Sequence, residues 1–287
     1  MSEPSSPFIS YICQTCGTQY PAAAQPPERC PICEDERQYI GYQGQQWTSL
    51  PALRRDRHNR IQVIEPGLSG IGTDPSFAIG QRALLVQTPA GNVLWDCISL
   101  IDDATIAQVK ALGGIAAIAI SHPHYYSAMI EWSRAFDVPV YLHAADREWV
   151  VRPDPAIVYW QGETQALPGG LTLIRCGGHF AGGTVLHWPA GAAGRGALLT
   201  GDIIHVVQDR RYVSFMYSYP NLIPLAPAAV RRIVAAIEPF AYDRIYGAWW
   251  EKIIPQDARE SVQRSAERYI RALEREPERD GALFRSL

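Results

Sequence analysis

From residue 61 onward, short apolar runs typical of strands alternate with mixed polar and apolar stretches typical of helices. The run at residues 114–120 is almost wholly apolar and rich in Ile, so it predicts a strand buried on both faces. Asp102 and Asp103 indicate the first turn of a helix, where the helix dipole favours negative charge. The expected strands are residues 61–64, 78–87, 91–97, 115–120, 138–143, 171–176, 183–188, 197–200 and 242–246, and the expected helices are residues 102–112, 127–136, 144–151, 227–237 and 256–276.

This order of elements predicts an α+β protein, because early strands give way to alternating strands and helices that can cover a sheet. Residues 78–87 and 91–97 are expected to form a hairpin. Residues 38–58 form a polar and aromatic connector. We place a domain boundary near residue 45, which gives a small N-terminal domain of residues 1–45 and a main domain of residues 46–287.

Composition narrows the class of protein. Apolar residues make up 47% of the 287 residues, which is ample for a sizeable core, and the net charge is −3 without a long block of one sign. This charge argues against a nucleic-acid or anionic-membrane surface. No apolar run approaches the roughly 20 residues that cross a bilayer. The first residues have neither a basic start nor an apolar segment typical of a secretory signal, so we expect a cytoplasmic protein. The oligomeric state does not follow from the sequence.

Four of the six cysteines form two C-x-x-C pairs with thirteen residues between them: Cys13, Cys16, Cys30 and Cys33. Pairs at this separation place four thiolates around one tetrahedral metal ion. Gly17 suits the tight turn of such a knuckle, since glycine tolerates positive φ. The remaining thiols, Cys97 and Cys176, lie in apolar runs and are interpreted as buried and inert. The first 40 residues resemble the rubredoxin-like domain of the rubrerythrins, and four thiolates accept either zinc or iron.

A second metal site is predicted where three strands end. His122 and His124 follow the 114–120 run, and side chains two apart in extended chain share a face. His179 lies in a glycine-rich turn directly after the strand expected at residues 171–176, and Asp202 follows the apolar run at residues 197–200. Strand-end loops are where a rigid scaffold displays functional groups. Together these residues predict a metal site built from imidazoles and one carboxylate.

Residues 60–250 resemble the metallo-β-lactamase superfamily, whose fold is an αββα sandwich with its metal site at one edge of two facing sheets. The first motif of that family, H-x-H-x-D-H, matches at His122 and His124, whereas Tyr126 and Ser127 replace its aspartate and last histidine. The resemblance maps the third histidine to His179 and the bridging aspartate to Asp202. No histidine follows the late strand, because that stretch reads Tyr-Gly-Ala-Trp. The resemblance therefore implies one metal ion, expected to be zinc with iron as the alternative, held by His122, His124, His179 and Asp202.

The chemistry expected of this site is hydrolysis by a single metal-bound hydroxide of an ester, thioester or lactone-like small molecule. Asp202 is either a metal ligand or a general base. Tyr126 either donates a hydrogen bond to the developing oxyanion or fills the space of the missing second metal. The aromatic residues at 210–220, with Trp249 and Trp250, either form the wall of a pocket for an apolar substrate or pack in a core or dimer contact.

Four other histidines receive ordinary interpretations. His205 is expected to lie outside the ligand set, His143 to pack at a strand end, His187 to be buried and hydrogen-bonded, and His58 to be solvated.

Two further function classes stay open. One is an oxidoreductase in which rubredoxin-type iron passes electrons to a non-haem iron, as the flavodiiron proteins suggest, although the second-site ligands are missing. The other is a non-catalytic binding protein with a degraded site.

Overall fold

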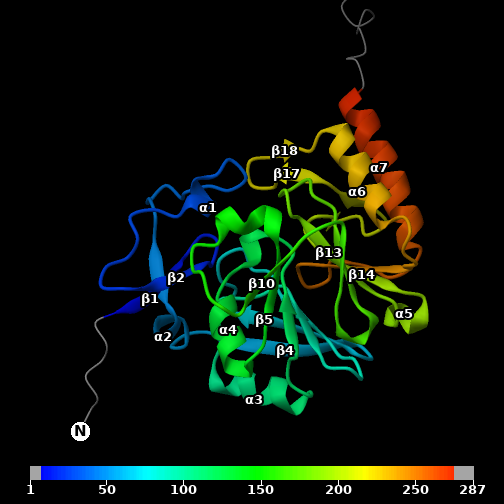
Figure 1. Ribbon diagram of the computed structural model, residues 1–287. Helices are drawn as coiled ribbons and strands as arrows, with labels where there is room; N and C mark the ends of the chain where they lie inside the picture. Colours follow the sequence, from blue (N-terminus) through cyan, green and yellow to red (C-terminus); the bar gives the residue numbers. More distant parts are fainter. Residues whose placement is uncertain (1–7, 275–287) are drawn as a thin grey trace, which may run out of the picture.

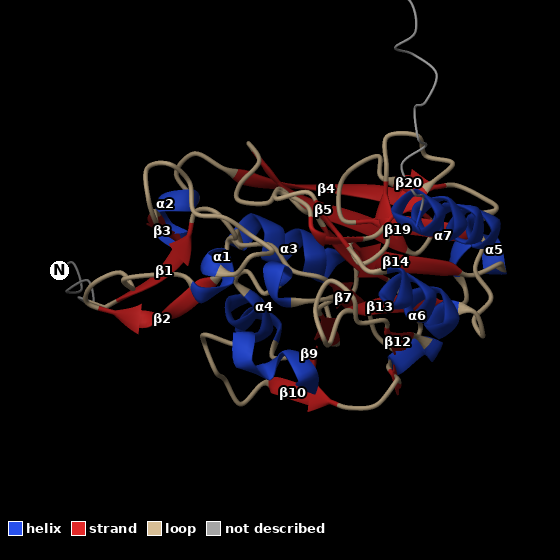
Figure 2. Ribbon diagram, turned by 90° about the horizontal axis from the view of Figure 1, so that it is seen from above, coloured by secondary structure: helices blue, strands red, loops and turns tan. Residues whose placement is uncertain are grey.

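The computed structural model describes residues 8–274, and two β-sheets packed face to face form the centre of its main body (Figures 1 and 2). The first sheet has seven strands. Their order across the sheet is β10 (Ile157–Trp160), β9 (Val140–His143), β8 (Ala117–Ala119), β7 (Val93–Trp95), β6 (Ala83–Val86), β5 (Leu68–Asp74) and β4 (His58–Glu65). The pairs from β10 to β7 are parallel, and those from β7 to β4 are antiparallel.

The second sheet has six strands, and its only parallel pair joins β14 to β19. The order is β11 (Thr164–Ala166), β12 (Thr172–Arg175), β13 (Thr184–Trp188), β14 (Ala197–Gly201), β19 (Arg244–Gly247) and β20 (Ile253–Ile254). Two small hairpins follow β14. They pair β15 (His205–Val206) with β16 (Val213–Ser214), and β17 (Met216–Ser218) with β18 (Ile223–Pro224).

Helices cover the outer faces of both sheets. On the first sheet, α3 (Asp103–Ala111) packs against β4 and α4 (Met129–Phe136) against β9. On the second, α6 (Pro227–Ile237) contacts β12, and α7 (Ala258–Glu274) runs beside α6 and contacts β19 (Figures 1 and 2). The remaining helical turns are short: α5 (Gly191–Gly194) and the 3-10 turns Pro123–Tyr125, Ala144–Trp149 and Pro168–Gly170. No described helix is both long and apolar enough to span a membrane.

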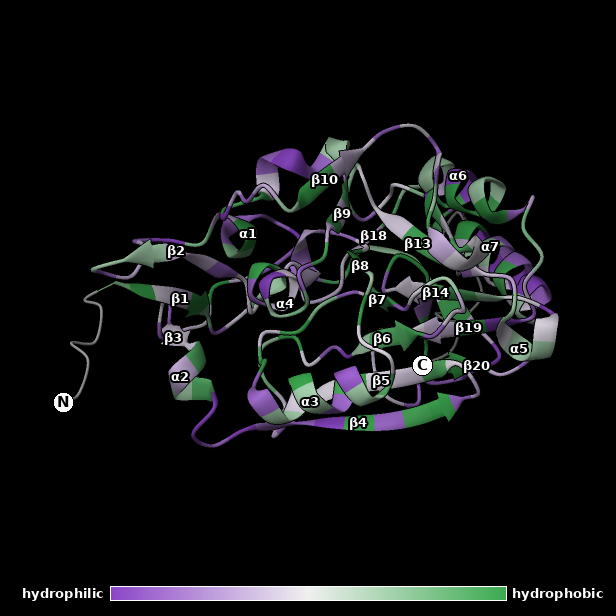
Figure 3. Cartoon of the chain, turned by 60° about the horizontal axis from the view of Figure 1, so that its bottom comes forward, coloured by the Kyte–Doolittle hydropathy of each residue, from purple (hydrophilic) through white to green (hydrophobic). Residues whose placement is uncertain are grey.

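Three apolar layers hold this sandwich together. Trp95 and Leu199 belong to the layer between the two sheets, Trp132 to the layer beneath α3 and α4, and Ile233 to the layer beneath α6 and α7. Figure 3 shows β6 as uniformly hydrophobic and β4 as mixed, which matches a central and an edge strand. Burying apolar surface on both sides of each sheet is the main stabilising contribution of this architecture. The predicted αββα sandwich is therefore confirmed.

The N-terminal residues form a three-stranded sheet beside the main body (Figure 1). It consists of β2 (Gln19–Ala23), β1 (Ile9–Cys13) and β3 (Trp47–Ser49), accompanied by α1 (Pro31–Glu34) and α2 (Leu50–Leu53). The third strand, β3, comes after the boundary proposed at residue 45 and still pairs with β1. The division into two domains at that point stays a prediction.

Most elements expected from the hydrophobic pattern form; several have shorter limits, whereas β4 and β14 are longer than expected. The strand expected at 78–87 begins only at Ala83, because Ala78 and Gly80 adopt positive φ and interrupt the extended chain. The short helix expected at 144–151 forms as a 3-10 helix over residues 144–149. The strands β5, β10 and β11 were not predicted, and β5 contains two glycines, which are depleted in strands. The last two residues of the helix expected at 256–276 lie outside the described residues.

Candidate metal centres

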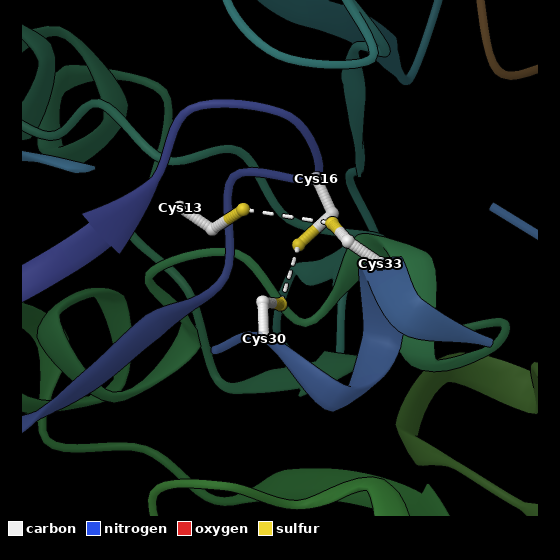
Figure 4. Close-up of side chains that lie close together, drawn as sticks. All are labelled: Cys13, Cys16, Cys30 and Cys33. Atoms are coloured by element: carbon white, nitrogen blue, oxygen red, sulfur yellow. Dashed lines mark hydrogen bonds between the residues drawn. The ribbon is translucent and has the colours of Figure 1, made fainter. Parts of the chain in front are cut away.

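The four knuckle cysteines converge as the sequence predicts (Figure 4). All are buried, and their sulfur atoms lie within 4.8 Å of one another. The Sγ atoms of Cys13 and Cys33 are 3.5 Å apart, and those of Cys16 and Cys30 are 3.7 Å apart. These distances match the edge of about 3.8 Å expected for a tetrahedron with metal–sulfur bonds of about 2.3 Å. The N-terminal residues therefore form a rubredoxin-like, zinc-ribbon-type knuckle.

The surroundings of Cys13 favour the thiolate form that binds metal. The neighbouring thiols, Cys16 first among them, lower the pKa of Cys13 by hydrogen bonding. The side-chain amide of Gln45 also donates a hydrogen bond to Cys13 Sγ at 3.1 Å. Gly17 has φ of 81°, and a Cβ there would lie 2.5 Å from Ser99 Oγ, so this turn requires glycine both for its conformation and for its contact with the main body.

Three histidines form the second centre. His122 and His124 follow β8, and His179 lies in the turn after β12. All three are 1–3% exposed, and their ligand nitrogens lie within 4.8 Å of one another. His122 is extended, as expected, but His124 lies within the 3-10 turn Pro123–Tyr125. The turn, and not strand alternation, brings the second imidazole to the first.

Hydrogen bonds orient two of these imidazoles. Nδ1 of His179 donates to the carbonyl oxygen of Tyr217 at 2.7 Å, which leaves Nε2 with its lone pair 3.1 Å from Nδ1 of His124. Nδ1 of His122 lies 2.9 Å from the Ser121 hydroxyl. A spacing of 3.1 Å is close to the roughly 3.3 Å between two nitrogens that share a tetrahedral zinc ion.

The protonation states also fit a metal ion. Burial lowers the pKa of all three imidazoles, that of His179 to about 4, so they are neutral at pH 7. Nε2 of His122 is buried and has no hydrogen-bond partner among the described residues. Buried nitrogens without partners are costly unless a ligand satisfies them. The donor set thus suits a divalent ion that prefers imidazole.

Asp202 follows β14 and lies beside this group. Its Oδ1 is 3.3 Å from Nε2 of His122 and has no hydrogen-bond partner among the described residues. It is not part of the cluster in which all ligand atoms lie within 4.8 Å. Burial raises the pKa of Asp202 to about 7, with a smaller contribution from the charge of Asp96. The choice between metal ligand and general base stays a prediction.

Tyr125, and not its neighbour Tyr126, packs against His122. Its ring centroid lies 4.4 Å from that of His122, and its buried hydroxyl has no hydrogen-bond partner among the described residues. Tyr126 instead donates its hydroxyl to the carbonyl oxygen of Asp146 at 3.3 Å. The oxyanion role assigned to Tyr126 stays a prediction, and Tyr125 is a second candidate that motif matching could not find.

Two further residues at this centre were not singled out from the sequence. Asp96 accepts a hydrogen bond from the backbone N–H of Ser121 at 2.8 Å and so fixes the chain before His122. Phe180 packs against all three imidazoles at centroid distances of 4.9–5.5 Å. Asp96 comes directly after β7, and an acidic residue at the end of a buried strand was the signal that could have identified it.

The remaining histidines and thiols lie outside the ligand clusters. His205 packs against Tyr219 and Trp249, His143 bonds to the carbonyl oxygen of Gly162, and His187 bonds to that of Ala241. His58 is exposed at the start of β4. Cys97 and Cys176 are buried, and burial raises the pKa of both thiols, which fits inert groups.

The aromatic segment after β16 does reach the histidine centre. The Tyr219 ring lies 5.7 Å from that of His179, and its hydroxyl donates to the carbonyl oxygen of Asp202 at 2.6 Å. Trp249 is one layer farther away, 5.3 Å from the ring of His205. Trp250 faces elsewhere, since it packs on Gly70 and Gly72 of β5.

Residues 35–38, here named the knuckle tail, link the two centres. Arg37 pairs with Asp35, donates to the carbonyl oxygen of His179 at 3.3 Å, and lies over the ring of Phe180 at 3.9 Å. The side chain of Asn221 donates to two carbonyl oxygens of the tail, each at 2.9 Å. The tail therefore covers the segments that carry the histidine centre, and Figure 1 shows the chain after α1 reaching toward β17 and β18.

Solved structures with the same fold are metallo-β-lactamases. The enzyme DIM-1 covers 74% of this chain and 97% of its own, with a TM-score of 0.55 and 13% identity. FIM-1 from Pseudomonas aeruginosa, in its mono-zinc form, covers 73% and 95%, with a TM-score of 0.55 and 15% identity. At these identities the likeness shows the fold alone. The protein thus has the metallo-β-lactamase fold with an added N-terminal cysteine knuckle.

A much closer sequence relative defines the family. The uncharacterized protein YmaE of Bacillus subtilis is 53% identical over 268 residues, which cover 93% of this chain and 97% of YmaE. The chain belongs to the same family as YmaE. No model of a known protein family matches it.

Proposed function

We propose that this protein is a metal-dependent hydrolase that uses one zinc ion at the histidine centre. The observation that carries the proposal is the convergence of three buried, neutral imidazoles at one point of a metallo-β-lactamase fold. A zinc ion held there supplies Lewis acidity that polarises a carbonyl group and activates water.

The residues at the second-metal positions support a single ion. Ser127 directs its hydroxyl to the carbonyl oxygen of Cys97, and Tyr126 directs its own to Asp146. The late strand β19 leads into Ala248 and Trp249, which offer no ligand of the usual kind. Within the described residues, the only clusters of three or more metal-binding groups are the cysteine knuckle and the three histidines.

The side chains around the ion have separate proposed roles in proton transfer, hydrogen bonding and substrate binding. In this proposal Asp202 accepts a proton from an attacking water molecule, which its unpartnered buried oxygen beside His122 supports. Tyr125 is placed to donate a hydrogen bond from beside the same imidazole. The rings of Phe180 and Tyr219 make the surroundings apolar, so the proposed substrate is an ester, thioester or lactone with an aromatic or hydrocarbon part.

The test is hydrolysis of an aryl ester, an aryl thioester and an aromatic lactone by the zinc-loaded protein. Turnover is expected to disappear on removal of the zinc and to return with its addition. His124→Ala should abolish it, and Asp202→Asn should lower kcat by about 100-fold or more. His58→Ala, which changes an exposed histidine, is the matched control. Comparing Tyr125→Phe with Tyr126→Phe identifies the hydroxyl that takes part.

Two outcomes oppose the proposal. One is a zinc-replete protein that hydrolyses none of the three substrate types. The other is turnover that His124→Ala leaves at the level of the unchanged protein, because a contaminating enzyme would then be its source.

An oxidoreductase is the second candidate, and the contact of Arg37 with His179 favours it, because it ties the cysteine knuckle to the histidine centre. Electron transfer would require iron in both places. Visible absorbance decides between the two functions, since ferric tetrathiolate is red and zinc tetrathiolate is colourless. A colourless protein with native metal content excludes this candidate.

A further inference from the structure

A cavity of about 550 Å³ lies between the edges of the two sheets, away from both metal centres. Three arginines line it: Arg60 from β4, Arg82 just before β6, and Arg210 from the loop between β15 and β16. Glu251 is the one acidic residue in its wall. None of the three arginines forms a salt bridge with any described residue.

Arg82 is the unusual member of this wall. This arginine is only 2% exposed. Its Nε is buried and has no hydrogen-bond partner in the described part of the chain. Nη2 donates one long hydrogen bond, 3.3 Å, to the carbonyl oxygen of Gly247. Burying a guanidinium without an acid costs free energy that a well-placed anion would offset. Burial accordingly lowers the pKa of Arg82 to about 10.

Trp250 holds the arginines in place. The guanidinium carbon of Arg60 lies 4.4 Å from the centre of its ring, and that of Arg82 lies 5.2 Å away. The indole packs on β5, where a Cβ on Gly70 or Gly72 would lie 2.8 Å from its atoms. The two glycines, which made β5 hard to predict from the sequence, thus leave room for the Trp250 ring to pack on the strand. Cation–π contacts of this kind fix a guanidinium while leaving its N–H groups free to donate.

We propose that this cavity binds a phosphate group, either as free phosphate or as part of a larger phosphate ester. The forked donors of arginine match phosphate oxygens, and three guanidinium groups against one carboxylate leave a positive charge for a dianion. The site is separate from the histidine centre. Consecutive residues divide the two, since Trp249 faces His205 whereas Trp250 faces the arginines.

The test is calorimetric titration of the metal-loaded full-length protein with inorganic phosphate and with adenosine monophosphate. Saturable binding that weakens as salt is added is expected. Arg82→Gln and Arg60→Gln should each weaken it by about tenfold or more, because charge-assisted hydrogen bonds are the stronger class. Arg55→Gln, which changes an exposed arginine outside the cavity, should leave it unchanged.

Further variants keep the result decisive. Arg60 and Arg210 are exposed, so Arg60→Gln and Arg210→Gln answer the question even where Arg82→Gln fails to fold. His124→Ala separates this binding from phosphate on the zinc ion, and full binding by that variant is expected. Tighter binding of the nucleotide assigns the site to a phosphate ester, and equal binding assigns it to free phosphate. No saturable binding, loss of binding in His124→Ala, or full binding in Arg60→Gln with Arg210→Gln would overturn the proposal.

Discussion

Single buried residues in this protein take the ionisation state that their surroundings allow. Asp146 shows this outside the metal-binding residues. Its carboxylate is 2% exposed and accepts a hydrogen bond from the N–H of Gly182 at 2.7 Å. Burial nevertheless raises its pKa to about 6, against 3.8 as the ordinary value, because one hydrogen bond does not replace full hydration. The same penalty keeps the three imidazoles neutral and ready for a metal ion.

Asp146→Asn tests this effect through the pH dependence of stability. A raised carboxyl pKa means that the folded protein binds the extra proton, so the free energy of unfolding falls as pH rises from about 4 to about 6. The asparagine carries no charge, and its oxygen can still accept from Gly182. Relative to the unchanged protein, the variant should therefore gain up to about 2–3 kcal/mol across this range. Urea unfolding at several pH values measures it. A difference that stays constant with pH, as expected for the exposed Asp56→Asn, would contradict the prediction.

At the scale of single elements, the turns at the ends of strands determine where the site residues lie. The strand β14, which ends just before Asp202, starts directly after a left-handed turn. Gly194 and Gly196 both adopt positive φ there, 84° and 87°. A Cβ on Gly196 would lie 2.1 Å from the carbonyl oxygen of Ala241, whereas nothing lies within 4 Å of one on Gly194. The turn therefore needs glycine at one position for conformation alone and at the other for close backbone contact as well.

The two substitutions to alanine should separate these causes. Gly194→Ala should lower the free energy of unfolding by about 1–2 kcal/mol, the cost of a left-handed L-residue. Gly196→Ala should lower it by about 2–5 kcal/mol, since a backbone clash is added to the same cost. Denaturant unfolding of both proteins provides the comparison. Equal losses would show that the contact with Ala241 relaxes without cost.

At the scale of the whole molecule, the N-terminal knuckle packs on the sandwich, and the knuckle tail covers the segments that carry the histidine centre. The knuckle tail binds the β17–β18 hairpin through Asn221 and through the hydroxyl of Tyr217, which donates to Glu36 at 2.6 Å. Arg37 lies over Phe180, which in turn packs on the histidines. The position of the tail depends on Cys33, since this ligand lies within α1 and the tail follows directly after that helix.

Loss of the knuckle ion should therefore expose the histidine ion. Cys30→Ser is expected to speed chelator extraction of zinc from the histidine centre by about tenfold, because a covering segment then opens more often. Stopped-flow measurement with a coloured chelator follows the release. Cys176→Ser, which removes a buried thiol outside both clusters, should leave the rate unchanged. An unaltered rate in Cys30→Ser would mean that the tail holds without its metal.

Metal content tests both centres together. Two ions per chain are expected, one in each cluster. Cys30→Ser and His124→Ala should each reduce the content to one while the far-ultraviolet circular dichroism stays that of the unchanged protein. Elemental analysis of the dialysed proteins gives the numbers. Loss of both ions from either variant would show that the two centres depend on each other thermodynamically.

The sequence by itself determined both clusters of metal-binding residues, because each signal is local. C-x-x-C pairs and histidines at strand ends indicate metal ligands whatever the packing of the elements that carry them. The class of fold followed from the same residues together with the resemblance that they support. The strand β5 was not predicted because it contains Gly70 and Gly72. These glycines are explained only by their contact with Trp250, which is distant in the sequence.

Tertiary structure alone decided the rest. Only the packed structure shows that Tyr125, and not Tyr126, lies beside His122. It also shows that the knuckle tail covers the histidine centre and that Arg82 is buried without an acidic partner. Each of these depends on contacts between residues distant in sequence. Side-chain direction and burial are settled only when the two sheets and the knuckle pack together, and no local pattern records that packing.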